Sequence, residues 1–300
     1  MKLSPIVLFT YNRLDTLKQT VDALSSNSLA MASDLIVYSD GSKSSTDEII
    51  IVKVRTYLKT ITGFKTITIH EAPTNMGLAN SIIDGVTNVI NQYGKVIVVE
   101  DDLVCSTNFL NYMNAALDFY SDQSKIFSIT GHSIPINCSH TDSDVYFTSR
   151  SSSWGWATWQ DRWSIIDWEV KDYTVFKKDK ILRRNFNKMG SDMSQMLDRQ
   201  MQGKINSWAI RWCYSQFKND LFSVHPYVSK VVNIGFNSSK ATNTKEKFNR
   251  YRTKLDDGVK DNFRFSKEYY LDPKIIRQFS QPYSIISRII YKAINLLFKN

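Results

Sequence analysis

From residue 5 to about residue 133, short apolar runs alternate with stretches whose apolar residues recur every three or four positions. The short runs are typical of buried strands, and the longer stretches are typical of amphipathic helices. Strand-like runs occur at 5–11, 34–40, 65–72, 95–102 and 125–132. Because strands joined through helices pair in parallel, this alternation predicts an α/β fold with a Rossmann-like, mostly parallel sheet flanked by helices.

The stretch behind the second run carries a start signal for its helix. Ser45 and Glu48 have the spacing of a capping box, in which the hydroxyl and the carboxylate each accept a backbone N–H of the first turn. This spacing predicts an N-cap at Ser45.

Polar and turn-forming residues gather where four of the predicted strands end. They occupy 10–13, 39–41, 73–81 and 100–102. Open α/β sheets bind ligands at the carboxyl ends of their strands, so we expect these clusters to meet in one site. The chain has neither a G-x-G-x-x-G nor a G-x-x-x-x-G-K-[ST] segment, and therefore no support for a Rossmann or P-loop mode of phosphate binding.

The fourth strand-like run ends in three adjacent carboxylates, Glu100, Asp101 and Asp102, directly after the apolar residues 96–99. Adjacent carboxylates at a buried strand end repel one another, so a cation is expected beside them. Mn²⁺ or Mg²⁺ would fit, because these ions take one or two carboxylates together with the phosphates of a ligand. We expect Asp102 to bind the metal directly, and Asp101 and Glu100 to contact ribose and sugar or to hold the loop.

Tryptophan is concentrated after about residue 135, in a region that otherwise has the character of loops. All seven tryptophans lie in 154–212: Trp154, Trp156, Trp159, Trp163, Trp168, Trp208 and Trp212. Such a cluster forms either an aromatic core or a platform on which sugar rings stack, and the pattern alone favours neither.

The last segment, 283–299, has the pattern of a basic amphipathic helix. Its apolar face comprises Ile285, Ile286, Ile289, Ile290, Ala293, Ile294, Leu297 and Phe298. This pattern favours attachment in the plane of an anionic membrane surface. Packing against the rest of the chain or against a second subunit is the alternative.

The formal net charge of +9 indicates an anionic partner, either a phosphate-bearing ligand, an acidic membrane surface or a nucleic acid. Nucleic acid would leave the acidic triplet without a role, so it is not expected. Cys105, Cys138 and Cys213 fit neither a metal knuckle nor a disulfide framework, which favours a reducing compartment. With no apolar run of about 18 residues, the chain is expected in the cytoplasm, peripheral on the inner face of the membrane.

As a set, the segments "PIVLFTYNR", "SDG", "NMGLANSI", "VVEDDL", "SSWGWATWQDRW", "SWAIRW" and "NIGFNSS" resemble bacterial family-2 nucleotide-sugar glycosyltransferases with the GT-A fold. The triplet is also similar to the E-D-D of the related N-acetylglucosaminyltransferase I. The resemblance covers about residues 3–240. It implies a GT-A domain over 1–240, with a nucleotide-sugar-binding half (1–133) and an acceptor half (134–240), followed by a basic extension over 241–300 that carries the amphipathic helix 283–299.

The resemblance also implies roles for individual residues. The nucleotide, usually uridine diphosphate, would be held by Thr10, Tyr11, Arg13 and Asp40, and the donor pocket would be lined by Asn75, Gly77, Leu78 and Asn80. The acidic triplet corresponds to the D-x-D metal motif. The Trp-rich loop resembles the acceptor side, which implies Trp154, Gly155, Trp156 and Trp208.

Two positions depart from the family pattern. Relatives often carry the catalytic base where this chain has Asn206, and an amide cannot accept a proton at neutral pH. Asp161 and Asp198 are the nearest carboxylates in sequence that could replace it. Relatives also often have a histidine near the metal after "NIGF", whereas 237–244 contains none.

The resemblance therefore implies a metal-dependent, inverting hexosyl- or N-acetylhexosaminyltransferase. It would move a sugar from a nucleotide donor to a hydroxyl of a glycan or lipid-linked acceptor in the synthesis of a surface polysaccharide such as lipopolysaccharide or capsule. Two alternatives stay open: an impaired or non-catalytic sugar-nucleotide-binding member, suggested by Asn206, and a sugar-nucleotide pyrophosphorylase. The latter would need a glycine-rich phosphate loop after the first strand, and "TYNRLD" has no glycine.

Overall fold

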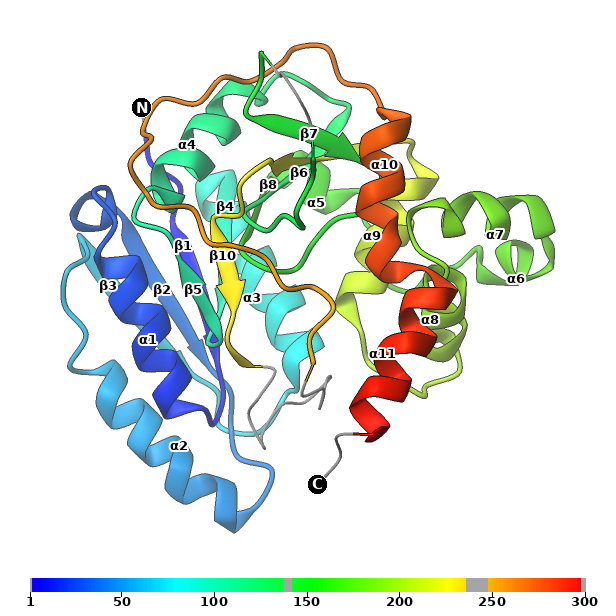
Figure 1. Ribbon diagram of the computed structural model, residues 1–300. Coiled ribbons are helices and arrows are strands. Elements are labelled where there is room, and N and C mark those ends of the chain that lie inside the picture. Colours follow the sequence, from blue (N-terminus) through cyan, green and yellow to red (C-terminus); the bar gives the residue numbers. More distant parts are fainter. Residues whose placement is uncertain (1, 138–141, 236–247, 298–300) are drawn as a thin grey trace.

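A computed structural model of the chain describes residues 2–137, 142–235 and 248–297 (Figure 1). Within these residues, eight strands form one mixed sheet whose neighbours are mostly parallel. In spatial order the strands are β3 (Thr66–Glu71), β2 (Asp34–Ser39), β1 (Ile6–Thr10), β4 (Lys95–Glu100), β8 (Trp156–Trp159), β6 (Ile126–Thr130), β9 (Phe222–Pro226) and β7 (Val145–Thr148). The predicted α/β fold is confirmed.

The sheet departs from the expected order beside β4. The fifth predicted run does form β6, but it does not pair with β4, because β8 lies between them and runs antiparallel to both. β8 is a four-residue strand in the segment that was expected to be a loop. That expectation was wrong because Trp156–Trp159 has only four residues, all of them buried, and so shows no alternation of exposed and buried positions.

Helices cover both faces of the parallel half, as the alternation along β1 requires. Ile6 and Leu8 point to one face, where α1 (Leu14–Ser25), α2 (Ser45–Leu58) and α4 (Phe109–Phe119) lie. Val7 and Phe9 point to the other face, which α3 (Leu78–Tyr93) and α9 (Trp208–Lys218) cover. Because β1, β2 and β4 each contribute residues to both hydrophobic clusters, their ends are held rigidly at the sheet edge.

The N-cap of α2 lies one residue earlier than predicted. The N-cap is Ser44, whose Oγ accepts the N–H of Asp47 at 3.2 Å. Two adjacent serines are followed three residues later by two adjacent acids, so both registers satisfy the capping pattern, and the sequence cannot separate them.

Short helices extend the sheet domain after β8. They are α5 (Gln160–Ser164), α6 (Tyr173–Lys178), α7 (Lys180–Phe186) and α8 (Met193–Met201). A separate two-stranded antiparallel sheet joins β5 (Leu103–Cys105), directly after the acidic triplet, to β10 (Val231–Asn233).

The described part of the extension, from residue 248 onward, packs along the sheet domain (Figure 1). A buried ion pair joins Lys230 Nζ to the Asp256 carboxylate at 2.8 Å, and the Tyr120 hydroxyl donates to the carbonyl of Ser266 at 3.0 Å. The chain then forms α10 (Pro273–Ser280) and α11 (Ile285–Leu297). The boundary predicted at residue 240 lies outside the described residues and stays a prediction.

Candidate active site

The polar clusters at the ends of β1 and β4 meet at one point. Thr10 Oγ1 and the backbone N–H of Tyr11 both donate to Asp101 Oδ2, at 2.9 and 3.1 Å. β1 and β4 are parallel neighbours, with Phe9 opposite Glu100, so the residues that follow them leave the sheet side by side. The expected meeting of polar clusters at the carboxyl edge is therefore observed for these two strands.

Arg13 supplies the cation that the acidic triplet requires. Its Nη2 lies 2.7 Å from Asp101 Oδ1, and its Nη1 lies 2.7 Å from Asp102 Oδ2. Asp101 is almost fully buried, and the guanidinium is mostly so. One planar cation thus bridges two consecutive carboxylates, a geometry that suits the fixed fork of arginine donors.

Burial and charge shift the pKa of each group in this cluster. Burial raises the pKa of Asp101 to about 6, against the opposing effect of Arg13. The crowded strand end raises the pKa of Glu100 to about 8 by desolvation, with the charge of Asp102 adding to the effect. Burial alone would lower the pKa of Arg13, but Asp101 and Asp102 outweigh it and leave that pKa above its ordinary value.

The carboxylate oxygens of the triplet are suitable ligands for a divalent ion at Asp102. Two aspartates share a single guanidinium, so the cluster keeps negative charge that a further cation can balance. Asp101 already accepts from Thr10, Tyr11 and Arg13, whereas Asp102 Oδ1 accepts no hydrogen bond from the described residues. Among the described residues, no group of three or more His, Cys, Asp or Glu side chains could hold a metal ion without other ligands. A ligand's phosphates would have to complete the shell.

Gly235 fixes how closely the chain can approach Asp102. A Cβ atom at this position would collide with the Asp102 carboxylate and would also meet Arg13 Nη1. The backbone N–H of Ile234 donates to the carbonyl of Asp102 at 2.9 Å. The end of β10 therefore forms one wall of the site.

Asp40, which was expected to hold the nucleotide, accepts all of its hydrogen bonds from the protein itself. Its Oδ1 accepts the N–H groups of Gly41 and Met76, both at 2.8 Å, and its Oδ2 accepts Gly77 N at 2.9 Å and Asn75 Nδ2 at 3.0 Å. Four donors fill the four lone-pair directions of a carboxylate. In this conformation Asp40 shapes the predicted donor pocket by holding 75–77 rather than by contacting a ligand.

The remaining predicted donor residues surround this loop. Leu78 begins α3 and is partly exposed, while exposed Asn80 donates through Nδ2 to the carbonyl of Met76 at 3.0 Å. Gly41 is required because a Cβ there would collide with the backbone of Thr74. The "SDG" and "NMGLANS" segments therefore form one interlocked unit.

Two residues of this region had no signal in the sequence. Asp47 accepts hydrogen bonds from the Tyr11 hydroxyl at 2.9 Å and from Asn12 Nδ2 at 3.0 Å. Arg55 donates to the carbonyl of Ala72 at 2.7 Å and lies 3.5 Å from Glu71. Both lie on α2 and brace the loops that follow β1 and β3, a role that depends on tertiary contacts.

The residues expected on the acceptor side separate into buried and accessible ones. Trp156 has no exposed surface and Trp208 only 3%, with ring centroids 5.1 Å apart in a cluster with Trp212. A fully packed ring cannot stack on a sugar, so in this structure these two tryptophans belong to the core. Gly155 is buried as well, and Trp154 is the member that stays partly exposed.

The structure gives no support to the two substitute bases. Trp159 pairs with Lys95 at the amino end of β4, so Asp161, two residues on, lies at the sheet edge opposite the triplet. Asp161 is also paired with Arg162 at 2.7 Å. Asp198 is bound by Arg183 at 2.7 Å, and that hydrogen bond lowers its pKa, which makes it a poor proton acceptor. The expectation that Asp161 replaces the base is therefore wrong, because Asp161 lies at the opposite edge of the sheet from the triplet.

Asn206 is exposed, directly before the N-cap Ser207 of α9. Its Oδ1 accepts from Arg211 Nη2 at 3.4 Å. The four histidines add no ligand near the triplet within the described residues. His132 and His225 are buried, His70 stacks on Tyr38, and His140, like Cys138, lies outside the described residues.

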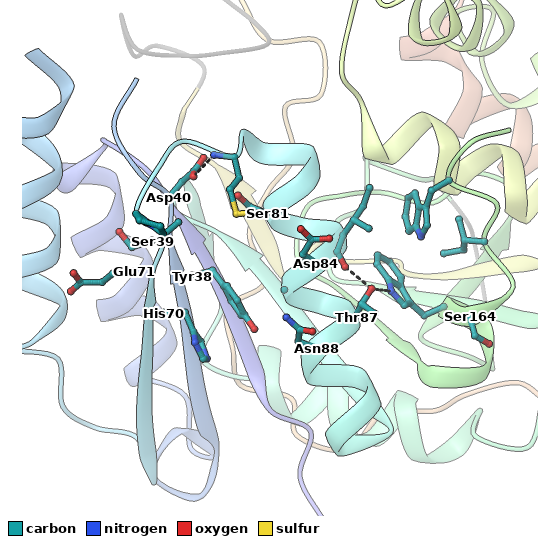
Figure 2. Close-up of a pocket in the computed structure, with 18 residues that line it drawn as sticks. Tyr38, Ser39, Asp40, His70, Glu71, Ser81, Asp84, Thr87, Asn88 and Ser164 are labelled. Atoms are coloured by element: carbon teal, nitrogen blue, oxygen red, sulfur yellow. Dashed lines mark hydrogen bonds between the residues drawn. The ribbon is translucent and has the colours of Figure 1, made fainter. Parts of the chain in front are cut away.

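A cavity of about 760 Å³ is lined by residues of β2, β3 and α3 and by residues within 163–168. Figure 2 shows Tyr38 and His70 on one side of α3, Ser164 on the other, and Asp84 and Asn88 on the helix between them. Arg13 and the three acids do not line it. Among the polar clusters at the strand ends, the cavity is lined by Ser39, Asp40, Pro73, Met76 and Ser81.

The family model described as "Glycosyl transferase family 2" matches residues 6–181, more than half of the chain. The search of curated proteins finds no match.

Several solved structures match part of the chain. TarS of S. aureus matches at 15% identity and a TM-score of 0.32, over 47% of this chain and 23% of that one. Its 1–349 fragment matches at 10% identity and 0.41, over 77% and 59%. The mannosyltransferase PcManGT of Pyrobaculum calidifontis, solved with GDP-Man and Mn²⁺, matches at 12% and 0.34, over 53% and 44%.

The chain spans less than two thirds of each of these solved proteins, and all three TM-scores are below 0.5. The relation to N-acetylglucosaminyltransferase I stays a prediction. The motifs, the sheet and the matched range agree on one point: the chain belongs to glycosyl transferase family 2.

Proposed function

We propose that the chain transfers a hexosyl or N-acetylhexosaminyl group from a UDP-sugar to a hydroxyl of a glycan or lipid-linked acceptor, with inversion at the anomeric carbon. The single observation that carries the proposal is the acidic triplet at the carboxyl edge of the sheet, bridged by Arg13 and left with excess negative charge. A site of this kind suits a cation shared with a diphosphate.

The reaction assigns a task to each part of the site. The acceptor oxygen attacks the anomeric carbon from the face opposite the diphosphate, the bond from that carbon to the diphosphate oxygen breaks, and the hydroxyl proton leaves to a base. Asp102 would hold Mn²⁺ or Mg²⁺, which when bound neutralises charge on the leaving diphosphate. Arg13 fixes the two aspartates, and the interlocked loops at Asp40 would shape the donor pocket.

The base is the unassigned part of the mechanism, and Asn206 makes it testable. A carboxylate at this exposed position could accept the proton, and general-base help contributes roughly 10²- to 10⁴-fold in rate. We expect Asn206→Asp to raise kcat by more than tenfold at unchanged donor affinity. Asn206→Gln is the matched control, since it changes the side chain without adding a base. An unchanged kcat in both variants would remove this position from the mechanism.

The proposal includes attachment to an anionic membrane surface through α11. Arg288 Nη2 donates to Gln195 Oε1 on α8 at 3.1 Å, so the polar side of the helix faces the protein. The apolar side faces outward, with exposed fractions of 50–78% at Ile285, Ile286, Ile289, Ile290, Leu296 and Leu297. No helix in the described ranges is long and apolar enough to cross a bilayer. An enzyme attached in this way would act on a surface polysaccharide precursor at the inner, cytoplasmic face of the membrane.

One assay separates the proposal from its rivals. The protein is incubated with a panel of UDP-sugars and Mn²⁺, and released UDP is measured. UDP release supports transfer or slow hydrolysis, exchange of pyrophosphate into the donor indicates a pyrophosphorylase, and tight UDP-sugar binding without turnover indicates a non-catalytic member. Asp102→Asn should abolish the Mn²⁺ dependence of UDP binding, and its persistence would contradict the metal assignment.

A further inference from the structure

A second cavity, of about 530 Å³, lies between β10 and the carboxyl-terminal extension. Its lining includes four aromatic residues and two polar ones: Trp154, Phe248, Tyr251, Tyr291, Asn233 and Arg252. Only Trp154 among them falls within the residues that the family model matches. The extension therefore supplies most of a cavity that the matched part of the chain does not possess.

This cavity adjoins the acidic triplet through β10. Asn233 and Ile234 both line it, and the N–H of Ile234 donates to the carbonyl of Asp102 at 2.9 Å. Asn233 also pairs with Leu103, the residue that follows the triplet. A ligand in the cavity would thus lie next to the place where the diphosphate is expected.

The walls of the cavity are held in place by contacts within the protein. The Phe248 N–H donates to Asn295 Oδ1 at 2.9 Å, and Asn295 Nδ2 donates back to the Phe248 carbonyl at 3.1 Å. Tyr251 packs edge-on against Trp154, with ring centroids 5.9 Å apart, and also packs against Tyr283 at 5.2 Å. α11 therefore fixes one wall, and the Trp-rich segment fixes the other.

The lining matches the chemistry of a pyranose. The C–H groups of a sugar ring carry partial positive charge and are attracted to the negative faces of aromatic rings. Amide and guanidinium groups then orient the hydroxyls, as a few polar groups do in most small-molecule sites. The charge of Arg252, which is exposed, would also favour an acceptor that carries an anionic group.

We propose that this cavity binds a pyranose of the acceptor glycan, with the extension as the part of the chain that selects it. The inference rests on the proposed function, because only a glycosyltransferase has an acceptor glycan. Tyr291 lies on the inward side of α11, while its neighbours Ile289 and Ile290 are exposed on the outward side. An acceptor sugar in the cavity would therefore lie beside the surface through which a lipid tail reaches the membrane.

Saturation-transfer NMR tests the proposal on the full chain. The probes are methyl pyranosides of glucose, galactose, mannose, rhamnose, N-acetylglucosamine and N-acetylgalactosamine. We expect at least one to bind, with transfer strongest at its ring C–H groups. Tyr291→Ala and Arg252→Ala should each raise the dissociation constant roughly two- to tenfold, in line with the size of single aromatic contacts. Lys292→Ala, an exposed neighbour on α11 outside the lining, is the matched control.

UDP affinity, measured by calorimetry with Mn²⁺ in the same variants, separates the two proposals. Saccharide binding that weakens in the two variants while UDP binding stays unchanged supports an acceptor site. No bound pyranoside, or equal binding in wild type and both variants, overturns the inference and leaves the proposed function standing. A loss of UDP-sugar binding in Arg252→Ala would overturn it too, because the cavity would then serve the donor. Saccharide binding without UDP binding would instead remove the proposed function.

Discussion

At the scale of single residues, the site is organised by one cation and one carboxylate. Arg13 bridges Asp101 and Asp102, and Asp40 ties the loop after β3 to the end of β2. The sequence located the acidic triplet and required a cation beside it, which the structure identifies as Arg13. It could not show that Asp40 has four internal donors, because that depends on how the backbone of 75–77 turns toward it.

Arg13→Gln tests the cation at the triplet. Removing one partner of a buried ion pair leaves an uncompensated charge and costs about 3–5 kcal/mol of unfolding free energy. We expect a lower melting temperature in the variant, and a larger stabilisation by Mn²⁺ than in wild type, because the ion can then take the position of the guanidinium. Thermal unfolding with and without Mn²⁺ measures both effects.

Lys53→Gln is the matched control, since it removes an exposed positive charge on α2. It should leave both the melting temperature and the response to Mn²⁺ as in wild type. An Arg13→Gln protein with wild-type stability would show that the bridge contributes nothing.

At the scale of elements, short aromatic segments and adjacent capping residues limited what the sequence could predict. The strands of the parallel half have apolar runs long enough to recognise, and they form as expected. β8 has no run of this length, because Trp156–Trp159 follows a segment with glycine and serine and leads directly into a helix. Because β8 lies at the centre of the sheet, Trp156 is buried in the core and packs there against Trp208. Both residues were expected to contact the acceptor.

The outward face of α11 is the element whose partner can be tested directly. Ile286 is 71% exposed, so Ile286→Glu should leave the fold unchanged. It should weaken sedimentation with vesicles that contain anionic phospholipid, because a carboxylate is repelled by the surface and opposes burial of the apolar face. Val259→Glu, at an 81% exposed aliphatic position in the extension, is the control. Equal sedimentation of both variants, or loss of a dimer in Ile286→Glu alone, would contradict attachment to lipid.

At the scale of the whole molecule, the extension and the sheet domain form one continuous structure. Arg150 forms a forked ion pair with Asp192 at 2.9 and 3.0 Å, and its guanidinium lies 3.8 Å above the ring of Tyr283. The same region encloses His225, which stacks on Tyr146 and contacts Phe279 of α10. Folding of the extension should therefore depend on the state of buried groups in the domain.

Two buried histidines make the stability of this interface depend on pH. Burial lowers the pKa of His225 to about 4 and that of His132 to about 3, where the neighbouring His225 adds to the effect. Both folded values lie below the unfolded value of about 6.5. Between about pH 6.5 and 4 the unfolded chain therefore binds more protons, and the free energy of unfolding falls as the pH falls. Each histidine contributes up to about 1.4 kcal/mol per pH unit in this window.

His225→Gln removes one of the two side chains that bind a proton when the chain unfolds. It should therefore reduce the dependence of the free energy of unfolding on pH. We expect the free energy of unfolding, measured with urea at pH 7, 6 and 5, to fall less steeply in the variant than in wild type. The carboxylates, including Asp101 with its pKa of about 6, are common to both proteins, so their effect on stability cancels in the difference. His70→Gln is the control, because His70 lies at the edge strand β3. If His225→Gln and wild type lose stability in parallel down to pH 5, His225 is not neutral in the folded protein, and the coupling between the core and α10 does not operate through its charge.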